Sequence, residues 1–388
     1  MRYLVLICTA IFLFSCGDST PVATDEARDP AIDSAEKYLE LYQSVKETSL
    51  PYASIYSDLA LVYSSRINYH QGVADANAAK GYVQLKLNRD DLGVAALSDA
   101  LKLYEESNDT AGIAQCCFHL AEAYRLQKNY TEAVSSVNRA ISLHESQRNF
   151  LLASSEMLLL GKIHAETAEY PFAFTDFEES VYAARQAGDT LSVVKALAGW
   201  GSAYTSSGDA DQGLAKHLAA LGKLDSMLSG NETDVLKFKA VLLNEMAGEY
   251  FLSGDYGAAI KTGEAGLKLA DSIGRLTEKC AAYKTLAELQ GLAGREDIQM
   301  QYMEKYIALN DSISRTMSNE WRAASMIRYQ LAQADVDAAR MQAENLETQL
   351  EEERVAAETN LMILAIVSLV VLTGLSVFLI MVRKKTRM

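Results

Sequence analysis

Histidine and cysteine are the residues of this 388-residue chain whose side chains could hold a metal or act in catalysis. No histidine belongs to an HExxH motif, and none has a cysteine at the spacing of a zinc site. No Walker loop, GxGxxG or GxSxG sequence occurs, and paired carboxylates fall on helix faces expected to be solvated. We therefore expect no catalytic residue, no metal site and no cofactor, and we predict that the chain is not an enzyme. The five histidines are His70, His119, His144, His164 and His217.

The cysteines outside the N-terminal leader are too few and too irregular for a disulfide framework. Cys116 and Cys117 are neighbours, and Cys280 lies far along the chain. Neighbouring cysteines on one helix cannot readily bridge each other. We interpret all three as small, buried, apolar residues.

Composition indicates an all-α chain with an acidic surface. Only four prolines occur, and no clear alternating apolar run indicates strands. The net charge is −15, from 51 acidic and 36 basic residues, which argues against a nucleic-acid partner.

Small residues recur at a period of about 40 residues, and this spacing predicts closely packed helix pairs. The best copy, 114–145, carries Leu120, Ala121 and Tyr124 at the L-G-x2-Y places of the pattern W-x2-L-G-x2-Y. Over 70–313 the chain resembles the tetratricopeptide repeat (TPR) family, in six units longer than the usual unit of about 34 residues. In this register His164 and His217 are expected to be core histidines. The small residues of the pattern are Gly81, Ala121, Gly161, Gly201, Ala247 and Ala287 in first helices, and Gly93, Ala133, Ala173, Gly213, Ala259, Ala100, Ala140, Ser180, Ala220 and Gly266 in second helices.

The segment before the repeats divides into three predicted parts. Residues 1–16 form a short apolar run ending in Leu-Phe-Ser-Cys, which resembles a bacterial lipoprotein signal peptide with Cys16 as the lipidated residue. An ordinary leader or an uncleaved anchor is the alternative. Residues 17–32 are polar and predict a disordered tether. Residues 33–69 predict a helix pair that lacks the small residues and caps the stack.

The segment after the repeats predicts a helical stalk and then a membrane span. Residues 314–360 carry an alanine-rich heptad pattern, which suits either a parallel coiled-coil homodimer or a lone rigid stalk. Residues 361–382 have no charge over a length that suits a transmembrane helix, and the tail 383–388 is basic. The positive-inside rule predicts a bacterial inner-membrane protein with periplasmic repeats and a cytoplasmic C-terminus.

The TPR resemblance implies a concave groove, lined by first helices, that binds a protein or peptide. Charged residues of both signs around aromatic residues suit an extended peptide or a helix of a partner. By analogy with the family, the groove residues are Tyr82, Phe118, Glu122, Arg125, Leu158, Lys162, Lys195, Asn244, Lys284 and Glu288.

The order of leader, repeats, stalk and span resembles the extracytoplasmic half of a class of bacterial sensors. In that class a histidine kinase or a helix-turn-helix regulator follows the span, and no such output domain is expected here. We therefore expect an all-α TPR solenoid with a stalk and one transmembrane helix, which acts as an adaptor or sensory input on a histidine kinase or regulator in trans. The alternative is a structural scaffold for an envelope assembly or secretion complex.

Overall fold

The structure is a computed structural model that describes residues 30–227 and 233–385. Within these ranges every regular element is a helix, which confirms the all-α prediction. The predicted signal peptide at 1–16, with Cys16, lies outside the described residues. So does all but the end of the tether predicted at 17–32.

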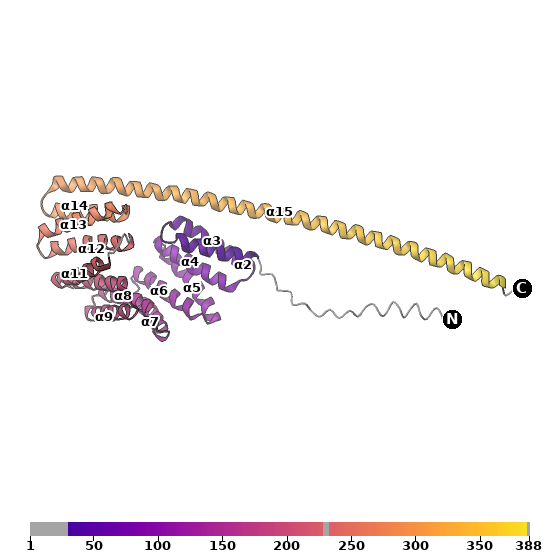
Figure 1. The fold of residues 1–388 in the computed structure, drawn as a ribbon, viewed down its shortest axis with the longest axis horizontal. Coiled ribbons are helices and arrows are strands. Elements are labelled where there is room, and N and C mark those ends of the chain that lie inside the picture. The colour runs from indigo at the N-terminus through magenta and orange to yellow at the C-terminus, as the bar shows by residue number, and fades with distance from the viewer. Residues whose placement is uncertain (1–29, 228–232, 386–388) are drawn as a thin grey trace. The chain divides into compact units, whose positions relative to one another are not determined.

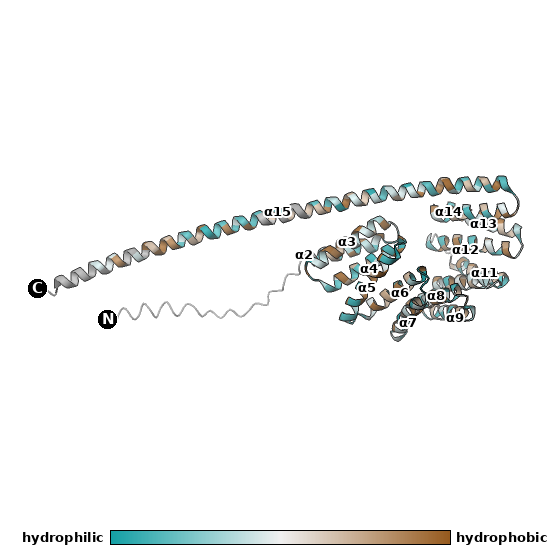
Figure 2. Ribbon diagram, turned by 180° about the vertical axis from the view of Figure 1, so that it is seen from behind, coloured by the Kyte–Doolittle hydropathy of each residue, from teal (hydrophilic) through white to brown (hydrophobic). Residues whose placement is uncertain are grey.

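The helices follow one another as antiparallel pairs joined by short turns, and each helix up to α14 packs on the next (Figure 1). Apolar and hydrophilic residues are mixed along each of these helices, as expected for helices that are buried on some faces only (Figure 2). The pairs are α2 (Pro30–Val45) with α3 (Leu50–Arg66), α4 (His70–Lys86) with α5 (Asp90–Ser107), α6 (Thr110–Leu126) with α7 (Tyr130–Ser146), α8 (Phe150–Glu166) with α9 (Tyr170–Gln186), α10 (Thr190–Ser206) with α11 (Ala210–Met227), α12 (Thr233–Leu252) with α13 (Tyr256–Ser272), and α14 (Leu276–Leu292) with the start of α15 (Glu296–Lys385).

A residue with left-handed backbone conformation lies in most of the turns between helices. The residue after the left-handed one donates its N–H to the carbonyl oxygen five positions earlier, as Tyr69 does to Ser64 at 2.9 Å. This hydrogen bond ends the helix. Glycine adopts this conformation without strain, whereas other residues meet a clash of Cβ. The residues with positive φ are Asn68, Asn88, Asn108, Lys128, Arg148, Ala168, Gly188, Gly208, Gly254, Gly274 and Gly294.

The small residues of the repeat pattern are all buried, and they lie where helices approach most closely. Gly201 of α10 and Gly213 of α11 show why size is limited there. A Cβ added to either glycine would lie 2.9 Å from the carbonyl oxygen of the other, a contact that real Cβ atoms essentially never make. The backbones can therefore approach only where the side chain is absent or very small.

The even-numbered helices form the inner side of the stack. Successive even-numbered helices from α4 to α14 contact each other, whereas among the described helices no contacts join successive odd-numbered ones. A stack that is tighter on one side curves toward that side. The even-numbered helices therefore line the concave face, as the TPR resemblance implies.

Helix α15 begins as the partner of α14 and continues for 90 residues without a break. The chain divides into two compact units within this helix, Met1–Trp321 and Arg322–Met388. The homodimer expected through the stalk at 314–360 stays a prediction.

The prediction of a membrane span at 361–382 is contradicted. A bilayer core needs about 20 consecutive apolar residues, and no helix in the described part of the chain combines that length with that apolar character. The predicted inner-membrane location, with periplasmic repeats and a cytoplasmic tail at 383–388, is contradicted by the same finding. The side chains of several residues of this segment lie outside the described set.

Ala168 and Gly188 provide a matched test of the turn geometry. Both have positive φ, of 61° and 70°, and a Cβ at position 188 would meet nothing within 4 Å. Because only backbone strain is involved, we expect Ala168→Gly to stabilise the repeats by about 1 kcal/mol and Gly188→Ala to destabilise them by a similar amount. Urea unfolding followed by circular dichroism measures both. A loss of stability in Ala168→Gly would show that this turn does not carry the strain.

Candidate functional site

The ten predicted groove residues all lie on even-numbered helices, and none of them is fully buried. The structure brings three of them, Leu158, Lys162 and Lys195, into one cavity. The others lie elsewhere along the inner helices. They are Tyr82 on α4, Phe118, Glu122 and Arg125 on α6, Asn244 on α12, and Lys284 and Glu288 on α14.

A cavity of about 390 Å³ lies between α8, α9, α10 and α12, and we call it the central cavity. Its size falls in the range of small-ligand pockets, about 300–1,000 Å³. One part of its lining is apolar and the rest carries charges of both signs. The apolar side chains include Leu158, Phe177 and Phe238, and the charged ones are Lys162, Lys195, Glu166 and Glu245.

The two lysines of the central cavity have no ion-pair partner within the residues that the structure describes. Partial loss of hydration in the groove, together with nearby Arg125, lowers the pKa of Lys162, although Glu122, Glu245 and Glu166 act in the opposite direction. Arg125 itself pairs with Glu166. The cavity therefore holds two positive charges that a ligand can neutralise.

Burial raises the pKa of Glu245, on the opposite side of the central cavity, and the nearby Glu249 carboxylate raises it further. His217 and Lys162 act in the opposite direction, but burial outweighs them. The Glu245 carboxyl group thus binds a proton more readily than a glutamate side chain in water. The protonation of Glu245 can therefore change with the charge of a bound ligand.

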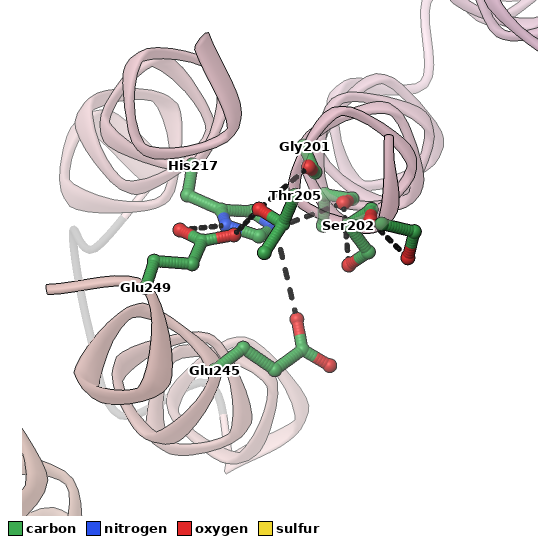
Figure 3. A network of polar contacts seen from close by, with 8 residues as sticks. Gly201, Ser202, Thr205, His217, Glu245 and Glu249 are labelled. Atoms are coloured by element: carbon green, nitrogen blue, oxygen red, sulfur yellow. Dashed lines mark hydrogen bonds and ion pairs between the residues drawn. The ribbon is translucent and has the colours of Figure 1, made fainter. Parts of the chain in front are cut away.

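A polar network around His217 shares Ala198 and Glu245 with the lining of the central cavity (Figure 3). His217 has no exposed surface, and its Nε2 lies 2.8 Å from the Ala198 carbonyl oxygen. Its Nδ1 lies 2.7 Å from Oε2 of Glu249, whose Oε1 accepts a hydrogen bond of 2.7 Å from Thr205. Oε2 of Glu245 is 3.8 Å from the imidazole Nε2.

The surroundings of His217 favour the imidazolium form. A carbonyl oxygen can only accept, so Nε2 must carry a proton, and Nδ1 faces a carboxylate. Burial opposes the positive charge, but Glu249, the Ala198 carbonyl and Glu245 outweigh it, so the pKa of His217 is raised. The prediction that His217 is a satisfied core histidine is confirmed.

A second pair of buried groups was not predicted from the sequence. Nδ1 of His144 lies 2.6 Å from Oε1 of Glu156, and both side chains are buried. His164 pairs in the same way with Asp176, at 2.5 Å. In both pairs the acid follows the histidine by 12 residues, the spacing that also separates Gly201 from Gly213 across a turn. This shared spacing is the sequence signal that could have identified both pairs.

The cysteines and the metal-ligand types show no reactive arrangement among the described residues. Cys116, Cys117 and Cys280 are free and buried, as predicted, and burial raises the pKa of Cys116 to about 12. No group of three or more His, Cys, Asp or Glu side chains in the described ranges could hold a metal ion.

Solved structures with similar folds are repeat proteins. No protein-family model matches this sequence, and no curated protein matches it. The apo form of RapI aligns with a TM-score of 0.55 at 13% identity, over 72% of this chain and 99% of its own. A Rap protein complexed with competence and sporulation factor aligns at 0.50 with 12% identity, over 76% and 98%. A signal transduction ATPase with a tetratricopeptide repeat sensor, from Pyrococcus horikoshii, aligns at 0.52 with 14% identity, over 74% and 46%.

At these identities the similarity shows the fold alone. The chain has a TPR-like fold of repeated helix pairs, which agrees with the resemblance seen in the sequence.

The His217–Glu249 pair predicts a pH-dependent contribution to stability. Because the folded-state pKa of His217 lies above the ordinary value of about 6.5, the contribution is fully present below about pH 6.5 and is lost as pH rises through the raised pKa. We expect Glu249→Gln to destabilise the chain by about 3 kcal/mol near pH 6 and by clearly less near pH 9. Urea unfolding at the two pH values measures the difference.

Glu264→Gln, which changes an exposed carboxylate on α13, is the matched control and should have little effect at either pH. Equal destabilisation by Glu249→Gln at both pH values would mean that His217 is not charged in the folded state.

Proposed function

We propose that this chain is a protein-interaction module that binds an extended peptide segment of a partner along its even-numbered helices, anchored at the central cavity. The observation that carries the proposal is the pair of lysines without ion-pair partners in that cavity. They lie among apolar side chains on the concave side of the stack. Charged groups without partners, at the edge of an apolar cavity, are typical of binding surfaces.

The lining of the central cavity suits a particular kind of peptide residue. Lys162 and Lys195 can donate charge-assisted hydrogen bonds to a carboxylate, either an acidic side chain or a C-terminus. Leu158 and Phe238 can cover an adjacent apolar side chain. The preferred anchor is therefore an acidic residue next to an apolar one.

The remaining predicted groove residues extend the proposed surface on both sides of the central cavity. Glu122 keeps a lowered pKa although burial alone would raise it, because His119, Lys86 and Arg125 stabilise its charge. Glu288 lies on α14, beside Thr285 and Leu292 in a shallower cavity of about 530 Å³. These side chains provide charges that could set the register of a bound peptide.

Two of the similar structures support an interaction role. One Rap protein was crystallised with competence and sporulation factor, and the ATPase is described as having a repeat sensor. An adaptor or sensory role toward a partner in trans is the finer part of this proposal. Helix α15 supports this role, because it starts as the partner of α14 and continues unbroken. A conformational change at the last repeat would therefore act directly on the rest of this helix.

Selection from a random peptide library on the immobilised full chain tests the proposal. We expect selected peptides to carry an acidic residue beside an apolar one, and fluorescence polarisation then gives their Kd. Lys162→Gln and Lys195→Gln should each weaken binding about tenfold, because each removes a hydrogen bond from a charged donor.

Lys268→Gln is the matched control, since it removes an exposed lysine from α13 on the other side of the stack. It should leave the Kd unchanged. If no peptides are enriched, or if all three variants bind equally well, the central cavity is not the anchor.

A further inference from the structure

A second cavity of about 550 Å³ lies beside the N-terminal parts of α6 and α8, and we call it the acidic cavity. Side chains from α4 to α8 line it, and it shares no lining residue with the central cavity. The lining includes three carboxyl groups, those of Asp75, Asp109 and Glu156, but no lysine or arginine. Its charge is therefore opposite to that of the two lysines in the central cavity.

Two of these carboxyl groups have partners within the fold. Oδ1 of Asp75 accepts a hydrogen bond of 2.6 Å from the Tyr104 hydroxyl. Oδ1 of Asp109 caps α6 by accepting from the backbone N–H groups of Ala111 and Gly112. Their remaining negative charge still acts on anything that enters the cavity.

Glu156 differs from Asp75 and Asp109, because one of its two carboxyl oxygens has no hydrogen-bond partner among the described residues. The residue is 2% exposed, and Oε1 lies 2.6 Å from Nδ1 of His144. Oε2 is buried and has no hydrogen-bond partner among the described residues. Leaving a buried polar atom without a partner is costly, so such an atom in a cavity wall indicates a missing hydrogen-bond partner.

The rest of the lining indicates which kind of chemical group would supply the missing hydrogen-bond partner. Phe118 and Leu152 give the cavity an apolar wall, and Leu152 is 44% exposed at its edge. An aliphatic stem can lie against this wall while a cationic head reaches the carboxyl groups.

We propose that the acidic cavity binds an alkylguanidinium or alkylammonium group, the chemistry of an arginine or lysine side chain, with Oε2 of Glu156 accepting an N–H from it. Asp75 and Asp109 stabilise the positive charge from the α4 and α6 sides. This site is independent of the peptide anchor proposed above, because it uses other residues and another charge.

Binding at this site releases a proton. Burial raises the pKa of Glu156 to about 8, and the neighbouring Glu145 adds to the effect, so the carboxyl group carries a proton at neutral pH. When a cation enters, the O–H bond at Oε2 of Glu156 breaks and the proton passes to the buffer, and Oε2 then accepts the ligand's N–H while Nδ1 of His144 donates to Oε1. One positive charge enters and one leaves.

The other titratable groups that face Glu156 do not reverse this link between cation binding and proton release. On α7, burial lowers the pKa of His144, and Glu145 favours the protonated acid. On α6, burial raises the pKa of Cys117, so its thiol stays neutral. Across the cavity, burial raises the pKa of Asp75 on α4 and of Tyr104 on α5, and the remaining titratable groups of the lining are Asp109 and His119.

Isothermal titration of the full chain with n-butylguanidinium tests the proposal, with the neutral isostere n-butylurea as the matched ligand. We expect saturable binding of the cation only. The affinity should be about tenfold higher near pH 8.5 than near pH 6.5, and near pH 6.5 about one proton should be released per cation when buffers of different ionisation enthalpy are compared. Equal binding of the urea would overturn the proposal.

Glu156→Gln keeps the side-chain length but cannot ionise, so it should weaken binding about tenfold and remove the pH dependence. If Glu156→Gln does not fold, Leu152→Arg provides a second test. Position 152 is partly exposed and should tolerate the change, and the guanidinium group of the new side chain can occupy the acidic cavity. Leu152→Arg should abolish binding, whereas Leu151→Arg, at an exposed neighbouring position outside the cavity lining, should not. A folded Glu156→Gln that retains pH-dependent binding, or a Leu152→Arg that still binds n-butylguanidinium, contradicts the site.

Discussion

The close approach of neighbouring helices at small residues is the constraint on which the rest of this structure depends. Where Gly201 faces Gly213, the backbones approach so closely that even a methyl group would not fit. Equivalent small residues are buried in each pair from α4 to α13. This packing brings the even-numbered helices into contact with each other, which makes their side the concave one. Both cavities are lined largely by these inner helices, so binding surfaces follow from the packing of the core.

The two buried histidine–carboxyl pairs show how partners decide the charge of similar groups. Glu249 has Thr205 as a second donor, and His217 has the Ala198 carbonyl as a second acceptor, so the ionised forms of both are hydrogen-bonded. Glu156 has no second donor, and burial beside Glu145 favours its neutral form. We therefore expect the first pair to stabilise the repeats, whereas the second leaves one carboxyl oxygen without a hydrogen-bond partner among the described residues, as the proposed cation site requires.

The two cavities give the inner side of the stack a charge asymmetry. The central cavity has lysines without ion-pair partners between α8 and α10, and the acidic cavity has carboxyl groups from α4 to α8. On the two proposals above, an acidic group of a ligand would bind at the central cavity and a basic group at the acidic cavity, because the reverse placement would bring like charges together. Apolar side chains next to each charged group reduce the exposure of the ligand to water and strengthen both contacts.

The sequence by itself determined the all-α class, the repeated helix pairs and the helices that carry the groove residues. These features follow from residue spacing alone. The small residues identify the places where two helices cross closely, and the repeat length puts equivalent residues on the same side of each successive helix pair. Tertiary structure alone decided which residues meet. Leu158, Lys162 and Lys195 share a cavity because the inner helices pack together there, and Glu156 lacks a partner because of how α7 and α8 bury it. The uncharged segment 361–382 predicted a membrane span, but no helix in the described part of the chain is both long and apolar enough to cross a membrane.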